Sequence, residues 1–345
     1  MTRPTLPSST SPTWPEDRGG HVWPKDREVV TDDGARIRYT VRGAEDGPWV
    51  VLCSGFICPD NFWRGLGEQL MRRHRVVVLN YRSVGASSDP RPPGWRARNL
   101  RAEDYTIERM AGDVAAVLDA EGAREVVPIG HSMGCQVALQ LWRARPDLVD
   151  GLTLVTGPYA SPLHTFYGNR LGTYLFPFAE LGLPLVPRPL QRALVRAPRL
   201  PIAMPVARLI RALGPETPAE DMAGYLRHFG EVDPMVALKI AQGMHRFDAG
   251  PWVHEVDVPT LVVVGSEDTF SPPVLGEQLL ATMPDAELVS VEGGTHAALI
   301  EHPFEIHDAV GGFLHRRLGW PAVPRQGRAS VLRGPLTTPV PAPPA

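Results

Sequence analysis

The stretch "VVPIGHSMGCQ", residues 126–136, places one serine between two glycines, directly after an apolar run and directly before a helical pattern. Gly130-His131-Ser132-Met133-Gly134 fits G-x-S-x-G, the pattern of a tight strand-to-helix turn that presents a nucleophilic serine. The same five residues also fit an ordinary tight turn. Ser132 is therefore a candidate nucleophile only if other parts of the chain supply a base, an orienting acid and donors for an oxyanion.

The chain around this turn alternates between short apolar runs and helical patterns. Dense apolar runs, typical of strands buried on both faces of a parallel sheet, lie at 49–55, 75–81, 125–129, 151–157, 260–265 and 287–291. Helices are predicted at 60–73, 102–123, 133–145 and 274–283 and from Pro303 onward, from apolar positions at helical spacing. The segments 28–33 and 36–43, separated by Asp33-Gly34, predict an antiparallel hairpin. Repeated β–α units imply an α/β fold with a doubly wound, mostly parallel sheet.

The alternation divides the chain into five parts. Residues 1–26 and the Pro-rich tail 319–345 are predicted to be disordered from their composition. The first part of the α/β core is predicted at 27–157 and the second at 251–318. Between them, residues 158–250 are rich in Pro, Leu and Arg and contain no convincing strand. This interruption predicts a helical cap inserted after the sixth main strand.

The best candidate for the base is His296, one of eleven histidines. It lies on a glycine-rich loop immediately after the last predicted strand, at the sheet edge expected for Ser132. His302 opens the following helix and is expected to pack or cap there. His131 lies inside the motif, but its side chain is expected to diverge from the Ser132 hydroxyl, so we interpret it as structural.

The acid that orients the base is predicted to be Asp268. "VVVGSEDTFSP" places Glu267 and Asp268 in the loop after a buried strand, at the same edge. Asp268 lies further into the loop and can turn toward His296, so Glu267 is the second choice. The order Ser132, Asp268, His296 is the chain order expected of this turn architecture.

The oxyanion donors are predicted to be two backbone N–H groups. One belongs to Met133, at the start of the helix behind the turn. The other comes from the loop after the strand 49–55, where Phe56 is the first choice and Ile57 the alternative.

With these pieces in order, the chain resembles the α/β-hydrolase family, in particular its capped lipase, esterase and meta-cleavage hydrolase branch. The resemblance covers about residues 27–318 and rests on four motifs in family order: "GHSMG" (130–134), "NYRSVGASS" (80–88), "GSEDTFSP" (265–272) and "GGTHAALIEHP" (293–303). Two departures stand out. Ser54-Gly55 replaces the family's usual His-Gly, and the segment 80–87 departs from Asp-x-Arg-Gly-x-Gly-x-Ser, with Arg82 interpreted as bracing a loop.

The resemblance implies a serine hydrolase that cleaves a hydrophobic carboxylic ester through an acyl-enzyme on Ser132, with no metal or organic cofactor. A serine in place of an aspartate disfavours haloalkane dehalogenase and epoxide hydrolase chemistry. C–C bond hydrolysis, acyl transfer and perhydrolysis use the same triad and stay open. A non-catalytic binding protein on this fold is disfavoured, because no triad member is missing.

Composition limits the partners and the setting of the protein. The net charge of −3 gives no general electrostatic case for nucleic acid or for an anionic membrane. Three cysteines, Cys53, Cys58 and Cys135, are too few and too irregular for a disulfide framework, and reduced thiols favour a cytoplasmic setting. No run reaches the roughly 18–20 apolar residues of a membrane-spanning helix.

The predicted cap has an unusual charge balance. Between Ala160 and Ala212 there are seven arginines and a single acid, Glu180, interleaved with "YLFPF", "LGLPLVP" and "LPIAMPVARLI". The simpler interpretation is that cap helices pack on the core with arginines on their solvated faces. The alternative hypothesis is an apolar tunnel for an acyl chain, plus a basic surface that rests transiently on anionic lipid.

Overall fold

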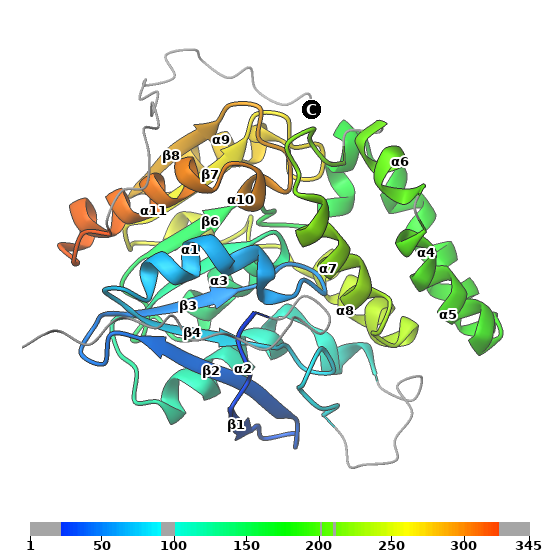
Figure 1. The fold of residues 1–345 in the computed structure, drawn as a ribbon, viewed down its shortest axis with the longest axis horizontal. Coiled ribbons are helices and arrows are strands. Elements are labelled where there is room, and N and C mark those ends of the chain that lie inside the picture. Colours follow the sequence, from blue (N-terminus) through cyan, green and yellow to red (C-terminus); the bar gives the residue numbers. More distant parts are fainter. Residues whose placement is uncertain (1–21, 91–100, 201, 210–211, 324–345) are drawn as a thin grey trace, which may run out of the picture.

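The computed structural model describes residues 22–90, 101–200, 202–209 and 212–323. Its centre is an eight-stranded sheet in the order β1-β2-β4-β3-β5-β6-β7-β8 (Figure 1). The strands are β1 Arg27–Val30, β2 Arg36–Gly43, β3 Trp49–Cys53, β4 Arg75–Leu79, β5 Val127–His131, β6 Leu152–Val155, β7 Thr260–Gly265 and β8 Ala286–Val291. β1 and β2 are antiparallel to their neighbours, and all other pairs are parallel. The predicted fold class is confirmed.

Two layers of helices cover the sheet. The side chains of β3 alternate between them, because successive residues of a strand point to opposite faces: Val51 belongs to one buried cluster, and Val50 and Leu52 belong to the other. The first cluster lies under α2 Ile107–Ala120, α3 Met133–Ala144 and α9 Pro273–Thr282; the second lies under α1 Arg64–Leu70 and α11 Pro303–Leu318. Strands covered on both faces explain the unbroken apolar runs in the sequence.

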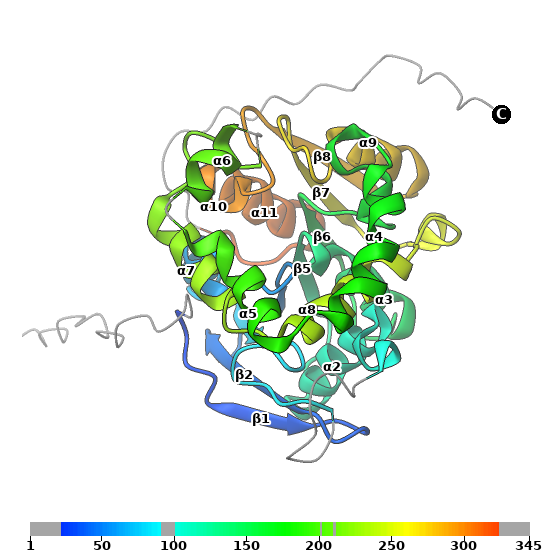
Figure 2. The same cartoon turned by 90° about the vertical axis from the view of Figure 1, so that its right-hand side faces the viewer.

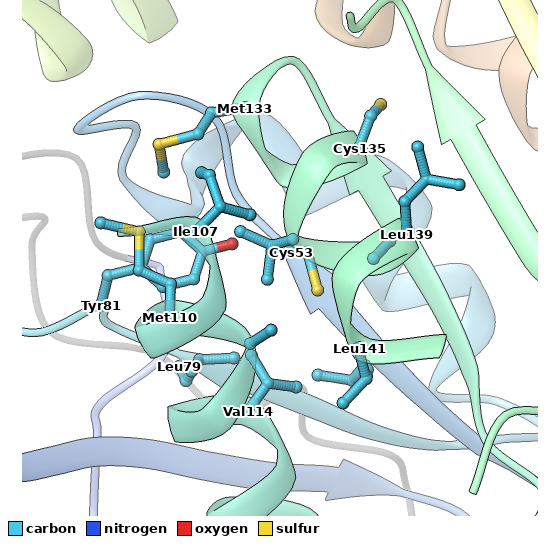
Figure 3. Close-up of a cluster of buried hydrophobic side chains, with 14 of the residues drawn as sticks. Cys53, Leu79, Tyr81, Ile107, Met110, Val114, Met133, Cys135, Leu139 and Leu141 are labelled. Carbon is cyan, nitrogen blue, oxygen red and sulfur yellow. The ribbon is translucent and has the colours of Figure 1, made fainter. Parts of the chain in front are cut away.

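Figure 3 shows part of the first cluster, where α2 and α3 meet β3 and β4. Met110 and Val114 of α2 lie near Leu141 of α3 and Leu79 of β4, and all four side chains are almost fully buried. Cys53, at the end of β3, lies within the same cluster. Burial raises the pKa of the Cys53 thiol to about 12, so this sulfur is an apolar packing group and not a thiolate.

Arg82, which the sequence analysis interpreted as a loop brace, is only 1% exposed. Its guanidinium donates to both carboxylate oxygens of Asp113 on α2, at 2.8 and 2.6 Å, and to Asp33 in the β1–β2 turn at 2.7 Å. A fourth hydrogen bond goes to the backbone carbonyl of Asp104 at 2.8 Å. The side chain thus ties the loop after β4 to the edge hairpin and to α2, which agrees with a structural role.

In its described residues, the connection between β6 and β7 contains five α-helices: α4 Leu171–Gly182, α5 Arg188–Arg196, α6 Ala203–Leu209, α7 Ala219–Phe229 and α8 Pro234–Arg246. We call them the inserted helices. They lie together at one end of the sheet, at the right of Figure 1 and toward the viewer in Figure 2. Within the described ranges, no helix is both long and apolar enough to cross a membrane.

The prediction of disorder up to residue 26 is wrong for residues 22–26. Trp23 is 3% exposed, and its ring lies against Gly67 on α1. Asp60 accepts hydrogen bonds from the N–H groups of Val22 and Trp23 and forms a buried ion pair with Lys25 at 2.5 Å. A large aromatic side chain and a paired carboxylate hold this segment, so composition alone misplaced its boundary. Residues 1–21 lie outside the described residues.

The predicted tail also begins too early. Gly319 ends α11 with a φ of 68°, a left-handed cap that glycine adopts without strain. Trp320 is 8% exposed and packs on the ring of His74, with ring centroids 5.7 Å apart. Residues 319–323 therefore belong to the folded body, whereas the remainder of the predicted tail, 324–345, lies outside the described residues.

His307 on α11 makes stability depend on pH. It is 5% exposed, neither ring nitrogen has a hydrogen-bond partner among the described residues, and burial lowers its pKa from 6.5 to about 4. Between these two values the unfolded chain binds a proton that the folded chain excludes. The free energy of unfolding therefore falls as the pH falls through this window, by up to about 1.4 kcal/mol per pH unit. We expect His307→Leu to lose less stability than the parent between pH 7.5 and pH 5, as measured by urea unfolding.

The matched control for this prediction is His254→Leu, because His254 is exposed. It should keep the pH dependence of the parent protein. An unchanged dependence in His307→Leu would contradict the assignment.

Candidate active site

The turn between β5 and α3 holds Ser132 in a strained conformation. Ser132 has φ 55° and ψ −124°, a backbone conformation that residues other than glycine rarely adopt. Such a conformation costs on the order of 1–3 kcal/mol of folding free energy. A Cβ on Gly134 would lie 1.8 Å from the carbonyl oxygen of Cys53, and a Cβ on Gly130 would lie 2.4 Å from the carbonyl oxygen of Gly134. Both glycines of the motif are therefore required sterically, where α3 packs against the end of β3.

Gly134→Ala should lower the free energy of unfolding by about 3 kcal/mol, because the added methyl group meets the backbone of a buried strand that cannot move aside. Urea unfolding measures this loss. The control is Gly112→Ala on α2, where no atom lies within 4 Å of the new Cβ. That variant should be more stable than the parent by about 0.5–1 kcal/mol. Equal effects at the two positions would contradict the steric argument.

Ser132, His296 and Asp268 form a continuous hydrogen-bonded chain. The Ser132 Oγ lies 2.8 Å from His296 Nε2, and His296 Nδ1 lies 3.0 Å from Asp268 Oδ2. The other carboxylate oxygen, Asp268 Oδ1, accepts from the backbone N–H groups of Phe270 and Ser271 at 2.8 and 2.9 Å. In this arrangement Nδ1–H donates to the carboxylate and Nε2 accepts a hydrogen bond from the Ser132 hydroxyl, which is the tautomer that a general base needs.

These three residues come together because each follows a parallel strand. Ser132 follows β5, Asp268 lies in the loop after β7, and His296 lies in the loop after β8. The carboxyl ends of β3 and β5 lie side by side where the strand order reverses, the position at which open α/β sheets bind ligands. Asp268, the first choice for the acid, contacts His296, whereas the second choice, Glu267, is exposed.

The loop after β3 lies against the serine. A Cβ on Gly55 would be 3.1 Å from the Cβ of Ser132. Ser54, which stands where the family usually has histidine, accepts a hydrogen bond from the indole N–H of Trp63 at 3.0 Å. Among the described residues, the N–H groups of Phe56 and Met133 make no hydrogen bond. Two predicted donors are thus unengaged, one on each side of the serine.

His131 supports the loop of His296, as a structural histidine would. Its Nε2 lies 3.1 Å from the carbonyl oxygen of His296 and donates to it, and the two rings lie 5.6 Å apart. Burial, and secondly the nearby His296, lowers the pKa of His131 to about 4. A neutral His131 ring adds no positive charge beside the His296 imidazole.

Sequence reasoning missed Glu301. It is 8% exposed and accepts four hydrogen bonds. Thr295 donates from its backbone N–H at 3.0 Å and from its hydroxyl at 2.8 Å, Gly214 donates from its N–H at 2.9 Å, and the Thr217 hydroxyl is also bound. Glu301 therefore joins the loop that carries His296 to the chain between α6 and α7. The glutamate five residues after the histidine is visible in the sequence, but its distant partners are not.

Glu301→Gln should turn one of the acceptor oxygens into an amide donor that faces other donors. We expect the free energy of unfolding to fall by about 2 kcal/mol, and kcat to fall about tenfold at an unchanged KM, because His296 is held less precisely in position. Ester hydrolysis and urea unfolding measure these effects. Glu292→Gln, exposed in the same loop, is the control and should match the parent. A change in KM alone would contradict a positioning role.

A cavity of about 500 Å³ adjoins the serine. Gly55, Phe56, His131, Ser132 and His296 line it on the side of the sheet. The inserted helices supply mainly apolar side chains to the rest of its wall: Phe176 from α4, Met204 and Ala207 from α6, Met222, Tyr225 and Leu226 from α7, and Met244 and His245 from α8. Within the described part of the chain, no group of three or more His, Cys, Asp or Glu side chains is placed to hold a metal ion.

A serine–histidine–aspartate chain on a strand-to-helix turn, at the carboxyl edge of a doubly wound sheet, is the arrangement typical of α/β hydrolases with a serine nucleophile. A family model described as the alpha/beta hydrolase fold matches residues 48–303. The chain belongs to this family, and its class of reaction is hydrolysis.

The individual relatives described next are each less than 30% identical to this chain. A putative carbamate hydrolase, RutD, from Azorhizobium caulinodans is 28% identical over 81% of this chain and 95% of its own length. Among solved structures, a hydrolase from Pseudomonas aeruginosa has a TM-score of 0.66 at 23% identity, covering 84% of this chain and 97% of that one. An esterase from Exiguobacterium antarcticum has a TM-score of 0.65 at 16% identity, covering 83% and 98%. At these identities the two structures show a shared fold only.

Proposed function

We propose that this protein is a serine hydrolase that cleaves hydrophobic carboxylic esters through an acyl-enzyme on Ser132. One observation carries the proposal. Ser132 is hydrogen-bonded to His296, which is hydrogen-bonded to Asp268, and the serine end of this series lines an apolar cavity of about 500 Å³. A nucleophile with its base in hydrogen-bonding contact supports acyl transfer, and an apolar wall supports a substrate with a sizeable hydrocarbon group.

In the proposed acylation step, Ser132 Oγ attacks the ester carbonyl while His296 Nε2 takes the hydroxyl proton. Asp268 is 3% exposed, and its negative charge stabilises the imidazolium that forms. Collapse of the tetrahedral intermediate breaks the bond to the alkoxy oxygen, and His296 returns the proton to that oxygen. The alcohol leaves, and the acyl group stays on Ser132 as an ester.

In the proposed deacylation step, His296 takes a proton from water, and the resulting hydroxide attacks the acyl carbonyl. Ser132 is then released with the proton on its oxygen, and the carboxylic acid departs. In both steps the negative charge on the carbonyl oxygen is assigned to the N–H groups of Phe56 and Met133. The unengaged state of both groups supports this assignment, because a donor that is free in the resting protein needs no rearrangement to bind an oxyanion.

Carbamate hydrolysis is the second candidate, because the curated relative named above is a putative carbamate hydrolase. The same triad would attack a carbamate carbonyl. The apolar wall from the inserted helices favours the ester, since a small polar carbamate leaves most of that wall without a partner and in contact with water.

A series of p-nitrophenyl esters from acetate to decanoate tests the proposal, alongside p-nitrophenyl carbamates of matched length. We expect kcat/KM to rise with acyl length, by up to about fourfold for each methylene that the cavity buries, until the cavity is filled. Faster turnover of carbamates than of esters at every length would favour the second candidate. A maximum at acetate would contradict a hydrophobic substrate.

A further inference from the structure

The outer surface of the inserted helices α4–α6 is unusually apolar. In the described part of the chain, fifteen large hydrophobic side chains are exposed, and twelve of them lie between residues 171 and 209. They are Leu171, Tyr174, Leu175, Phe178, Leu181, Leu185, Leu190, Leu194, Leu200, Ile202, Val206 and Leu209. The most exposed are Leu185 at 84% and Leu209 at 82%. We call these twelve residues the apolar face.

The apolar face lies on the outermost helices of the molecule. Figures 1 and 2 show α4, α5 and α6 outside α7 and α8, on the side away from the sheet. α4 and α6 also contribute Phe176 and Met204 to the wall of the cavity. These two helices are thus apolar on the side that lines the cavity and on the side that meets solvent. A helix that is apolar on all sides is normally buried, and a large exposed apolar surface normally marks an interaction site. The outer side of these helices is therefore expected to be covered by a binding partner.

Basic side chains accompany the apolar face. Arg170, Arg192, Arg196, Arg199 and Arg208 are exposed, and no ion pair of theirs occurs among the described residues. The one acid between residues 170 and 209 is Glu180. On α5, Leu190 and Leu194 lie one turn apart, as do Arg192 and Arg196. At 100° per residue the two pairs lie at opposite edges of the exposed side of the helix, with Pro189 and Ala193 between them.

The unpaired arginines favour an anionic bilayer over a second copy of the chain as the partner of the apolar face. A second copy docked about a two-fold axis would bring the same surface together, so unpaired arginines would meet arginines with no acids to neutralise them. An anionic bilayer offers both complements, since leucine and phenylalanine side chains enter its interfacial region while arginine side chains reach its phosphates. We propose that the apolar face of α4–α6 docks this protein reversibly on the surface of membranes that contain anionic phospholipids.

Docking in this mode places the helices in the plane of the interface and does not require any of them to cross the bilayer. The apolar wall of the cavity then lies directly behind the docked surface, on the same two helices. The proposal does not depend on the reaction at Ser132, so binding and catalysis can be tested separately.

Flotation with vesicles tests the proposal. The full chain, in the form of Ser132→Ala so that no lipid is hydrolysed, is mixed with vesicles of phosphatidylcholine alone or with one third phosphatidylglycerol, at 50 mM and 500 mM salt. We expect binding to the anionic vesicles at low salt, weaker binding at high salt and little binding to phosphatidylcholine alone. Each arginine near an anionic surface contributes about 1 kcal/mol, so the loss of two arginines in Arg192→Glu/Arg196→Glu should lower the partition coefficient at least about thirtyfold.

The apolar contribution is tested with Phe178→Ser/Leu185→Ser, which should lower the partition coefficient at least tenfold. The matched controls are Arg72→Glu/Arg73→Glu and Phe304→Ser, whose parent side chains are exposed outside the inserted helices. These controls should bind as the parent does. All these side chains are on the surface, and circular dichroism checks that each variant is folded.

Three results would overturn the proposal. The first is no flotation of the parent chain at low salt. The second is equal loss of binding in the control variants, which would indicate non-specific charge attraction. The third is a dimer in light scattering that Phe178→Ser/Leu185→Ser converts to a monomer while neither variant changes flotation, which would assign the face to a second copy of the chain.

Discussion

Replacing Ser132 with alanine is expected to lower kcat for ester hydrolysis by a factor of about 10⁴ or more and to abolish labelling by a fluorophosphonate probe. The hydroxyl is the group that becomes the acyl ester, and its only polar partner in the triad is His296 Nε2 at 2.8 Å. The substitution removes one oxygen atom in a turn whose backbone is held by Gly130 and Gly134, so the protein should stay folded. Steady-state ester hydrolysis measures kcat, gel fluorescence measures the labelling, and circular dichroism checks the fold.

The matched control for this prediction is Ser161→Ala. Ser161 lies 2.6 Å from Nδ1 of His245, so it is a second serine in contact with a histidine, and that histidine also lines the cavity. Ser161 does not lie on a strand-to-helix turn of this kind, and we expect its variant to be labelled as the parent is. Labelling that survives in Ser132→Ala but disappears in Ser161→Ala would transfer the nucleophile to Ser161.

Replacing Asp268 with asparagine should lower kcat about 10⁴-fold without unfolding the protein. The backbone N–H groups of Phe270 and Ser271 donate to Oδ1, and so they select the orientation in which the asparagine oxygen occupies that position. The amide NH₂ then points at His296 Nδ1 and donates to it. The ring must accept there and carry its proton on Nε2, the tautomer that cannot accept a proton from Ser132.

The control for Asp268→Asn is Glu267→Gln, which changes the neighbouring, exposed acid in the same way. Steady-state kinetics should show the parent rate in Glu267→Gln and a lower kcat at little changed KM in Asp268→Asn. If the two variants lost activity equally, the orienting acid would have to be reassigned.

Much of this site could be predicted from the sequence, because its parts depend on local patterns and on one topological rule. Apolar runs such as 260–265 identify buried strands, and the turn at 130–134 identifies the nucleophile. Parallel strands bring their carboxyl ends to one edge, so Asp268 and His296 could be placed near Ser132 although 136 and 164 residues separate them along the chain (268 − 132 and 296 − 132).

The boundaries and the supporting contacts could not be predicted in this way. Trp23 is held by Gly67, and Glu301 is held by Gly214 and Thr217, in segments that no repeat or spacing connects. Such contacts depend on which surfaces the folded chain brings together. The same is true of the inserted helices, where the apolar run "YLFPF" at 174–178 has the composition of a buried segment, yet Tyr174 and Phe178 are 69% and 73% exposed.

The sequence by itself therefore determined the α/β fold, the order of its strands and helices, and the identity of Ser132, Asp268 and His296 as the residues to test. Periodicity and turn sterics are properties of neighbouring residues, and the parallel topology carries them to one edge. Only the tertiary structure decided the hydrogen-bonding distances within that group, the apolar cavity beside it and the uncovered apolar face of α4–α6. Those features depend on burial, and burial is set by the packing partner of each face, which the pattern along the chain does not specify.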